Sequence, residues 1–575
     1  MENNTIIVDH IEVALEGERN LLEVIRKVNI ELPTFCYQPE LSIYGACRMC
    51  IVEVEQNGRK GLMPACSTPP VPGMVITTNT AQIRKLRKIT VELMLANHNM
   101  ECTTCSRGDD CKLRQVANDL GIEKVRYRNI VQPAEIDDSS AAVVRDSSKC
   151  IKCGNCVRVC REIQSVGVLD FAYRGSDTVI TVGFGHGLGE SACIGCGQCL
   201  KVCPVGALTP NFQIDPVWAA ISDETKVTTA AIAPAVRVAV GEAFGFQPGE
   251  VLNGKIATAL RMLGFDRVYD TVFAADETIL EEGTEFLGRV TGGGVLPQFT
   301  SCCPGWVKFV EQFYPEFIPN LSSCKSPQQM LGSTVKDVLV TKEGLKRENI
   351  VNVSIMPCTG KKMEAKRPEF AVDGNPDVDY VITSTELIRM IKQAGINFAA
   401  LEPSEFDMPF GEGTGAGVIF GASGGVMEAA LRFAANTLGY EPKCEQLRGE
   451  DGIRSADVTF GDITVRAAVV SGLANARQLM EDIKAGKAQY DIVEVMACPG
   501  GCVNGGGQPL HEHHLDTVAR RTKGLFENDV TLAHSSEENK QLVAMFEEHF
   551  GKIGGHKSHE LLHTTYVDRS NDLVK

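Results

Sequence analysis

The chain has 575 residues, of which 43% are hydrophobic and 23% charged, and its formal net charge is −16. This length predicts about four domains of roughly 150 residues each, and the acidity argues against a general nucleic-acid binder. The first ten residues carry neither the basic nor the apolar region of a secretory signal, and the apolar run 230–240 is too short to cross a bilayer. We therefore expect a cytoplasmic protein without membrane contact, in which cysteines serve more often as metal ligands than in disulfides.

Residues 1–80 are predicted to form a small β-rich domain. Short apolar runs at 5–8, 11–14, 51–54 and 74–77 indicate strands, and residues 21–28 indicate one helix. A loop cysteine, a close pair and a distant fourth have the spacing typical of plant-type 2Fe–2S ligands: Cys36, Cys47, Cys50 and Cys66. Gly45 would let the backbone close around the sulfurs. Structural zinc is the alternative for these four residues.

Residues 81–127 are predicted to begin with an amphipathic helix at 82–96, with basic side chains at Arg84, Lys85, Arg87 and Lys88. These side chains can receive an acidic partner or form a solvated helix face. Four potential ligands follow the helix: His98, Cys102, Cys105 and Cys111. Such a set can hold zinc or a 4Fe–4S cluster. Its position between two iron–sulfur patterns favours the 4Fe–4S cluster.

Residues 128–210 contain the bacterial ferredoxin pattern, C-x2-C-x2-C-x3-C, twice. In this pattern the fourth cysteine of each run ligates the other cluster. One 4Fe–4S cluster is therefore predicted on Cys150, Cys153, Cys156 and Cys203, and a second on Cys193, Cys196, Cys199 and Cys160. Zinc knuckles or disulfides are the alternatives, but zinc sites use paired Cys-x2-Cys hooks rather than two complete four-cysteine runs.

Residues 211–575 are predicted to form one large domain, whose first residues belong to a linker at 210–225. Strand-like apolar runs alternate with helical stretches, which indicates mainly parallel sheets with helices on both faces. The strand-like runs are 227–233, 351–356, 378–383, 464–471 and 492–496, and the helical stretches include 254–263, 385–393 and 425–434.

Four cysteines of this domain lie in glycine- and proline-rich turns: Cys303, Cys358, Cys498 and Cys502. Their surroundings read TSCCPGW from Thr300, MPCTGKKMEA from Met356 and EVMACPGGCVNGGGQP from Glu494. Such turns bring thiolates and backbone N–H groups close to a compact inorganic group. The residues alone predict one more buried 4Fe–4S cluster. The accessory clusters would carry single electrons in series, which is useful only if a catalytic site receives or supplies those electrons. We therefore expect the catalytic site in this region.

The three motifs, in this order, resemble the signature motifs of FeFe-hydrogenases, and the accessory patterns resemble the monomeric clostridial type of that family. The N-terminal order also resembles the hydrogenase-like subunit of respiratory complex I. The resemblance covers essentially the whole chain and implies an α+β multidomain fold. Its parts would be a β-grasp 2Fe–2S ferredoxin-like domain at 1–80, a small 4Fe–4S domain with one histidine and three cysteine ligands at 81–127, a two-cluster ferredoxin-like domain at 128–210 and an α/β catalytic domain at 211–575.

The catalytic cofactor that the resemblance implies is the H-cluster. A 4Fe–4S cubane on the four motif cysteines would share the Cys502 sulfur with a two-iron subcluster that carries carbon monoxide, cyanide and an azadithiolate. Because one protein bond reaches the two irons, surrounding contacts must hold them. Lys361 would donate to one cyanide and the backbone of Ala233 and Pro234 would contact the other. Met356, Met496, Gln328 and Phe420 would line the pocket.

The family also implies a proton path. Cys302 matches the terminal proton donor, and the remaining relay positions are Glu282, Ser322, Glu285 and Arg289. On a helix over 278–290, the two glutamates and the arginine lie on one stripe that borders an apolar face. Carboxylates at such a border can have raised pKa values and pass protons. The alternative is a solvated helix face.

Several positions depart from the family pattern. Ala235 and Gly360 replace serines, Pro499 replaces a histidine, and Cys324 replaces an alanine near Ser322. These changes bear on redox tuning and oxygen sensitivity rather than on the reaction. We expect Cys324 and Cys444 to be plain buried thiols.

The resemblance implies an enzyme that interconverts protons and dihydrogen and exchanges electrons with ferredoxin or a similar small carrier. Other proteins would install the two-iron subcluster, and we expect a monomer. A non-enzymatic iron–sulfur scaffold is one alternative, but a scaffold needs no proton relay. Hydrogen sensors of the family typically alter the Cys302 position and add a signalling domain. An electron-transfer subunit would leave the C-terminal motifs unexplained.

Overall fold

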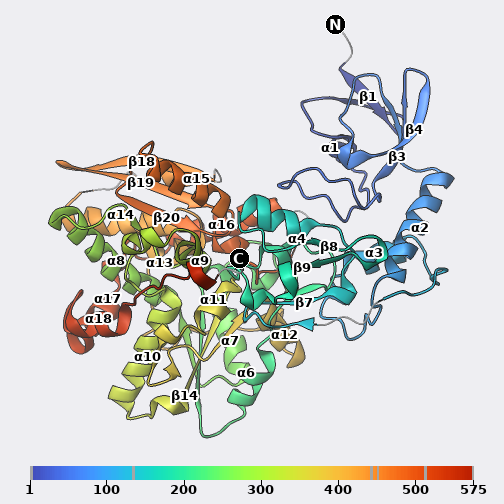
Figure 1. The fold of residues 1–575 in the computed structure, drawn as a ribbon. Coiled ribbons are helices and arrows are strands. Elements are labelled where there is room, and N and C mark those ends of the chain that lie inside the picture. The colour runs from blue at the N-terminus through green and yellow to red at the C-terminus, as the bar shows by residue number, and fades with distance from the viewer. Residues whose placement is uncertain (1–3, 132–135, 441–444, 450–451, 511–513, 573–575) are drawn as a thin grey trace.

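The computed structural model describes residues 4–131, 136–440, 445–449, 452–510 and 514–572. Cys444, predicted to be a buried thiol, lies outside the described residues. Figure 1 shows the N-terminal β-rich part at one end, a large body of helices and sheets at the other, and the segment that contains β7, β8 and β9 between them. Among the described residues, no helix combines the length and the apolar character that crossing a membrane requires.

The N-terminal part is a five-stranded sheet in the order β2-β1-β5-β3-β4, in which β1 and β5 are parallel and the other neighbours antiparallel. The helix α1 (Leu21–Lys27) begins after Asn20, whose side chain accepts from the Glu23 amide, and buries four apolar residues. The strands are β1 (Thr5–Val8), β2 (Ile11–Ala14), β3 (Ile51–Gln56), β4 (Arg59–Pro64) and β5 (Val75–Thr77). The edge strand β4 was not predicted, because its residues are almost all exposed and give no alternating pattern.

The helix α2 (Ala81–Ala96) begins after the cap Thr80 and is followed by α3 (Lys112–Asp119). Arg87 departs from the predicted basic face, since its side chain is buried. Its guanidinium donates to the carbonyl oxygens of Met49 at 3.0 Å, Ile51 at 2.8 Å and Thr78 at 3.2 Å. Arg87 therefore fastens α2 to the sheet.

The middle part contains two short helices, α4 (Asn155–Arg158) and α5 (Gln198–Lys201), each preceded by a glycine with positive φ, Gly154 or Gly197. Its strands are β6 (Ile136–Asp137), β7 (Val143–Asp146), β8 (Asp170–Ala172), β9 (Val179–Thr181) and β10 (Leu208–Pro210). Residues 210–225, predicted as a linker, contain the helix α6 (Ile214–Ile221). Ile214 and Val217 bury one face of this short helix in the core of the large body. The polar and proline residues around them hid the helical pattern in the sequence.

Two sheets organise the large body. The first has the order β12-β11-β14-β17 and is wholly parallel. The second has the order β13-β20-β19-β18, parallel except for the antiparallel edge strand β18. The strands are β11 (Val227–Ile232), β12 (Arg267–Asp270), β13 (Gln298–Phe299), β14 (Ile350–Met356), β17 (Tyr380–Thr383), β18 (Ile453–Phe460), β19 (Ile463–Ser471) and β20 (Ile492–Met496), with the small pair β15 (Ala371–Val372) and β16 (Asn375–Pro376) beside them.

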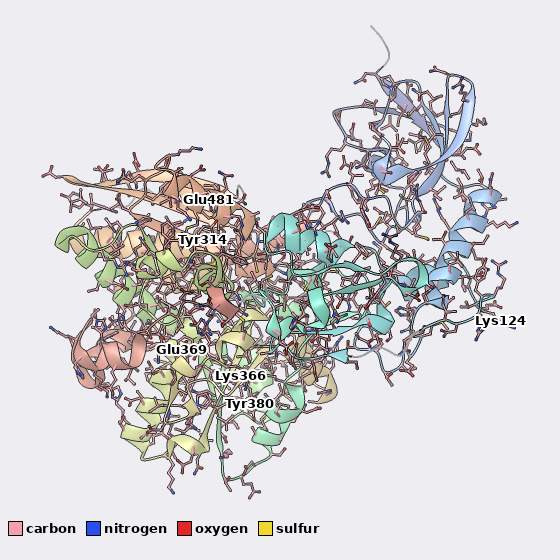
Figure 2. The ribbon with its side chains drawn as sticks, in the orientation of Figure 1. Lys124, Tyr314, Lys366, Glu369, Tyr380 and Glu481 are labelled. Carbon is pink, nitrogen blue, oxygen red and sulfur yellow. The ribbon has the colours of Figure 1, made fainter. Side chains whose placement is uncertain are left out.

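Helices flank and separate these sheets. The 21-residue helix α8 packs on α10 and α14 and buries most of its N-terminal half. The Tyr314 hydroxyl, just after α9, donates to Glu481 on α15 at 2.7 Å (Figure 2). The α-helices are α7 (Asn253–Leu263), α8 (Val272–Gly292), α9 (Pro304–Phe313), α10 (Pro327–Glu343), α11 (Gly360–Glu364), α12 (Ser384–Gln393), α13 (Gly415–Val418), α14 (Gly425–Leu438), α15 (Leu473–Lys484), α16 (His514–Asp529), α17 (Lys540–Met545) and α18 (His556–Leu562).

Candidate metal-cluster sites

A pocket lies where the carboxyl ends of strands from both sheets meet. Ala233 and Pro234 follow β11, Met356 ends β14 and Met496 ends β20, and all four line the pocket. Parallel sheets place their sites at this edge. Phe420, from the segment after α13, closes another wall.

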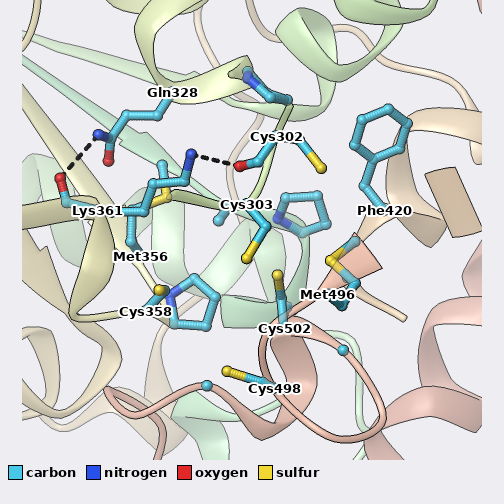
Figure 3. A pocket seen from close by; sticks show the side chains of 18 of the residues that line it. Cys302, Cys303, Gln328, Met356, Cys358, Lys361, Phe420, Met496, Cys498 and Cys502 are labelled. Carbon is cyan, nitrogen blue, oxygen red and sulfur yellow. Dashed lines mark hydrogen bonds between the residues drawn. The ribbon is translucent and has the colours of Figure 1, made fainter. Parts of the chain in front are cut away.

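The four motif cysteines line this pocket, and Figure 3 shows their thiols directed toward one space. Cys303 immediately precedes α9, whose first residue is a proline, and Cys358 and Cys498 follow β14 and β20. Positive φ angles at Gly500 (77°) and Gly501 (98°) let the chain turn back so that Cys502 rejoins the group.

Burial makes these thiols hard to ionise alone. It raises the pKa of Cys358 to about 11 and that of Cys498 well above its usual range, and the neighbouring thiols add to the rise at Cys498. Thiolates crowded in an apolar pocket require a cationic group between them. This donor set therefore fits a metal cluster.

Lys361 and Gln328 lie side by side at the edge of the pocket (Figure 3). The Lys361 ammonium donates to the Cys302 carbonyl oxygen at 3.0 Å and to both oxygens of Glu364 at 3.0 and 3.1 Å. Gln328 donates to the Lys361 carbonyl oxygen and to Glu364, whereas its buried Oε1 has no partner among the described residues. Sequence reasoning missed Glu364, although its spacing of three from Lys361 on a helix was a usable signal.

The predicted proton-path residues form a connected group. The Ser322 hydroxyl donates to Glu285 Oε2 at 2.9 Å, and the Arg289 guanidinium donates to Glu285 Oε1 at 2.6 Å. The pKa of Glu282 is raised to about 8, mainly by burial and further by the nearby Glu285. Burial also raises the pKa of the Cys302 thiol, and Glu282 adds to that rise. Cys302 lines the pocket, so the group runs from the pocket toward the partly exposed Arg289.

The solvated-face alternative is wrong for Glu282, which is 2% exposed. Its Oε1 is buried without a hydrogen-bond partner among the described residues. A buried carboxyl in this state favours the protonated form.

The first accessory cysteines also come together. Cys36 and Cys47 have their sulfurs 3.4 Å apart, and the Cys66 amide donates to the Cys50 sulfur at 3.4 Å. The amide of Phe35 donates to the Cys47 sulfur at 3.5 Å. Sulfurs that receive backbone N–H groups suit a thiolate-bound cluster.

The His98 ring is buried, and its Nδ1 has no partner among the described residues. A buried orphan nitrogen of this kind fits a metal ligand. Cys105 and Cys111 are electrostatic neighbours, and the Cys105 sulfur also lies against Gly206. This set therefore adjoins the end of the double ferredoxin run.

The two ferredoxin runs are interleaved in space as well. After burial, the nearby Cys203 raises the pKa of the Cys150, Cys153 and Cys156 thiols, although Cys203 belongs to the other run. After burial, Cys193 and Cys160 likewise raise the pKa of the Cys199 thiol. The structure thus brings Cys203 close to the first run and Cys160 close to the second, and the exchanged ligand sets stay a prediction from the spacing.

The predicted cluster sites adjoin one another. Cys36 is an electrostatic neighbour of Cys153, and Cys203 is one of Cys199. Cys196 lines the same pocket as Cys498 and is its electrostatic neighbour. The Thr359 hydroxyl donates to the Gly195 carbonyl oxygen at 2.8 Å, which holds the two cluster loops together.

Family models cover most of the chain. Residues 226–506 match "Iron only hydrogenase large subunit, C-terminal domain" and residues 515–569 match "Iron hydrogenase small subunit". The N-terminal matches are a 2Fe-2S iron-sulfur cluster binding domain (3–81), an NADH-ubiquinone oxidoreductase-G iron-sulfur binding region (87–126) and a 4Fe-4S dicluster domain (149–207).

Similar proteins include an NADP-reducing hydrogenase subunit of Solidesulfovibrio fructosivorans, 42% identical, with 98% of this chain and 99% of the relative covered. Iron hydrogenase 1 of Clostridium pasteurianum is 40% identical over the same shares of 98% and 99%. A solved structure of an apo FeFe-hydrogenase from Chlamydomonas reinhardtii is also similar, with 42% sequence identity and a TM-score of 0.57. The match covers 62% of this chain and 98% of the solved chain.

Proposed function

The chain belongs to the iron-only (FeFe) hydrogenase family, and from that membership we propose how its residues hold the clusters and move electrons and protons. The family predicted from the motifs is confirmed, and with it an enzyme that interconverts protons and dihydrogen at an H-cluster served by iron–sulfur clusters. The observation that carries the proposal is the meeting of Cys196, the motif cysteines and Cys302 in one pocket.

We propose one 2Fe–2S cluster, three accessory 4Fe–4S clusters and the H-cluster, in the four units 1–80, 81–127, 128–210 and 211–575. The electrostatic proximity of Cys36 to Cys153 and of Cys203 to Cys199 supports a continuous electron path from the N-terminal part to Cys196. The H-cluster, when bound at Cys303, Cys358, Cys498 and Cys502, supplies the two-electron chemistry that interconverts protons and dihydrogen.

Pocket residues position and enclose the cofactor. The Lys361 ammonium is held at the pocket edge by Glu364, which keeps a positive charge beside the cofactor site. Met356, Met496 and Phe420 exclude water with apolar side chains. Ala235 leaves this wall without the hydroxyl that the family pattern has there.

The proton path would run from the Cys302 thiol through Glu282, Ser322 and Glu285 to Arg289. With a pKa of about 8, Glu282 can hold a proton at neutral pH and still release it. The Ser322 hydroxyl donates to Glu285, and its hydrogen bond with Glu282 lowers the pKa of that carboxyl. It can therefore pass a proton between the two carboxyls. Arg289 keeps the Glu285 carboxylate in place at the outer end.

For the electron partner, we propose ferredoxin or a similar small carrier, with the chain acting as a monomer after maturation proteins install the two-iron subcluster. A second candidate is a partner subunit, because the relative from Solidesulfovibrio fructosivorans is named a subunit of an NADP-reducing hydrogenase. Dihydrogen evolution from reduced ferredoxin by the loaded chain tests the choice. A rate with reduced viologen but none with ferredoxin would favour the partner subunit.

A further inference from the structure

A compact group of three side chains adjoins the proton path. Among the described residues, one carboxylate oxygen of Glu285, the Cys324 sulfur and one ring nitrogen of His563 all lie within 4.8 Å of one another. Glu285 comes from α8, Cys324 from the segment before α10, and His563 from the position after α18. Cys324 is fully buried, and the His563 side chain is 7% exposed.

The backbone fixes the positions of Cys324 and His563. The two residues form an antiparallel bridge. On either side of it, the Lys325 amide donates to the Leu562 carbonyl oxygen at 2.7 Å and the Thr564 amide donates to the Ser323 carbonyl oxygen at 2.8 Å. Groups held by packed backbone in this way are preorganised for binding.

The His563 ring is oriented by a buried carboxylate. Its Nε2 lies 3.1 Å from Glu281 Oε2, and the same carboxylate accepts from the Gly554 amide. Its Nδ1 lies 2.8 Å from the Ser323 hydroxyl, which a metal ion at this nitrogen would displace. Histidines that bind metals generally donate their other ring N–H to such a carboxylate, which leaves the second ring nitrogen, here Nδ1, as the ligand.

We propose that Glu285, Cys324 and His563 form a binding site for one Zn²⁺ ion, and that the bound ion closes the proton path. A thiolate, an imidazole and a carboxylate form a ligand set that suits zinc, whereas magnesium and calcium prefer oxygen alone. Three protein ligands leave one position for water. On binding, the Cys324 thiol loses its proton to solvent and the sulfur takes the ion instead.

The ion would act through Glu285. This carboxylate now receives hydrogen bonds from Ser322 on Oε2, from Arg289 on Oε1 and from the Ser323 amide. A cation on one of its oxygens would compete with the donor at that oxygen. Binding rests only on the three ligands, whereas closure of the path also rests on the proposed proton relay. The two parts can therefore fail separately.

Binding is tested by anaerobic calorimetric titration of ZnCl₂ into the fully loaded enzyme, with iron content measured before and after. The parent should bind one ion per chain at this site and keep its iron. Cys324→Ala and His563→Gln should lose that stoichiometric binding, and Glu281→Gln should weaken it about 10- to 100-fold, as expected for a residue that orients a ligand. Cys444→Ala, at a cysteine assigned to no cluster, should bind like the parent.

Inhibition is measured on the same samples as dihydrogen evolution, each variant relative to its own rate without zinc. The parent should lose activity at the zinc concentration that fills the site and recover it with a chelator, while Cys324→Ala should resist. Equal binding by the parent, Cys324→Ala and His563→Gln, or no stoichiometric binding, would overturn the site. Binding without inhibition would support the site and overturn closure of the path.

Discussion

The Ser322 hydroxyl donates to the Glu285 carboxylate at 2.9 Å and joins residues that are 37 positions apart in the sequence. This bond links the helix α8, which carries Glu282 and Glu285, to the segment that precedes α10. It is the one step of the proposed proton path made by a hydroxyl, which can accept and donate a proton at the same time.

Ser322→Ala should slow dihydrogen evolution about 100-fold, within the usual range for loss of a proton-transfer group. The hydroxyl is removed but the volume hardly changes, so cluster content should stay normal. Ser322→Thr keeps a hydroxyl and should retain much of the rate. A Ser322→Ala enzyme with the parent's rate and the parent's solvent isotope effect would exclude this serine from the path.

The raised pKa of Glu282, about 8, predicts a pH dependence of catalysis. The acid form, present below this pH, supplies protons for evolution, so evolution should fall as the pH rises through about 8. Dihydrogen oxidation needs the base form and should rise over the same interval. Glu282→Gln cannot ionise and should lose both this inflection and most of the rate. Rate profiles in both directions check the sign, and an unchanged inflection in Glu282→Gln would assign it to another group.

Lys361→Met should weaken retention of the two-iron subcluster. The substitution removes the ammonium at the pocket edge and leaves the buried Glu364 carboxylate without the cation of its ion pair. Iron analysis should show a loss confined to the subcluster, with the signals of the accessory clusters unchanged. Lys366→Ala is the matched control, because Lys366 is exposed two residues after α11. Equal subcluster content in Lys361→Met and the control would contradict the role given to Lys361.

Arg87→Ala should destabilise the N-terminal part, because it removes the donor of three carbonyl oxygens, two of them in buried contacts. The expected cost is about 3 kcal/mol, the scale of losing hydrogen bonds to a charged group. Loss of the 2Fe–2S circular-dichroism signal on heating provides the measurement. Lys85→Ala, on the exposed side of the same helix, should leave the transition in place. Equal transitions for the two variants would show that Arg87 does not fasten α2.

The sequence was most informative where chemistry depends on short spacings. Cysteine runs identified the residues that the structure groups around Cys203 and Cys498, and apolar runs located β11, β14 and β20 within a residue or two. Exposed or isolated elements gave no such pattern, as the edge strand β4 and the helix α6 show. Pairings between distant segments, such as the bridge between Cys324 and His563, depend on tertiary packing and have no local signature.

The proton-path residues show what the sequence could predict and what only the fold could show. Their positions came from a family resemblance, since the stripe on α8 equally allowed a solvated face. Only the packing of α8 against the rest of the body buries Glu282 and raises its pKa. The departures at Gly360 and Pro499 have no explanation in the contacts described.

The most direct test is dihydrogen evolution from a reduced viologen, measured anaerobically with the chain loaded with the two-iron subcluster, alongside Cys302→Ala. We expect rapid evolution by the parent and near-silence by the variant at equal iron content, because the pocket-lining thiol is the proposed last proton donor. No dihydrogen from the fully loaded parent would contradict the assigned reaction. Equal rates for the two proteins would contradict the proton path that begins at Cys302.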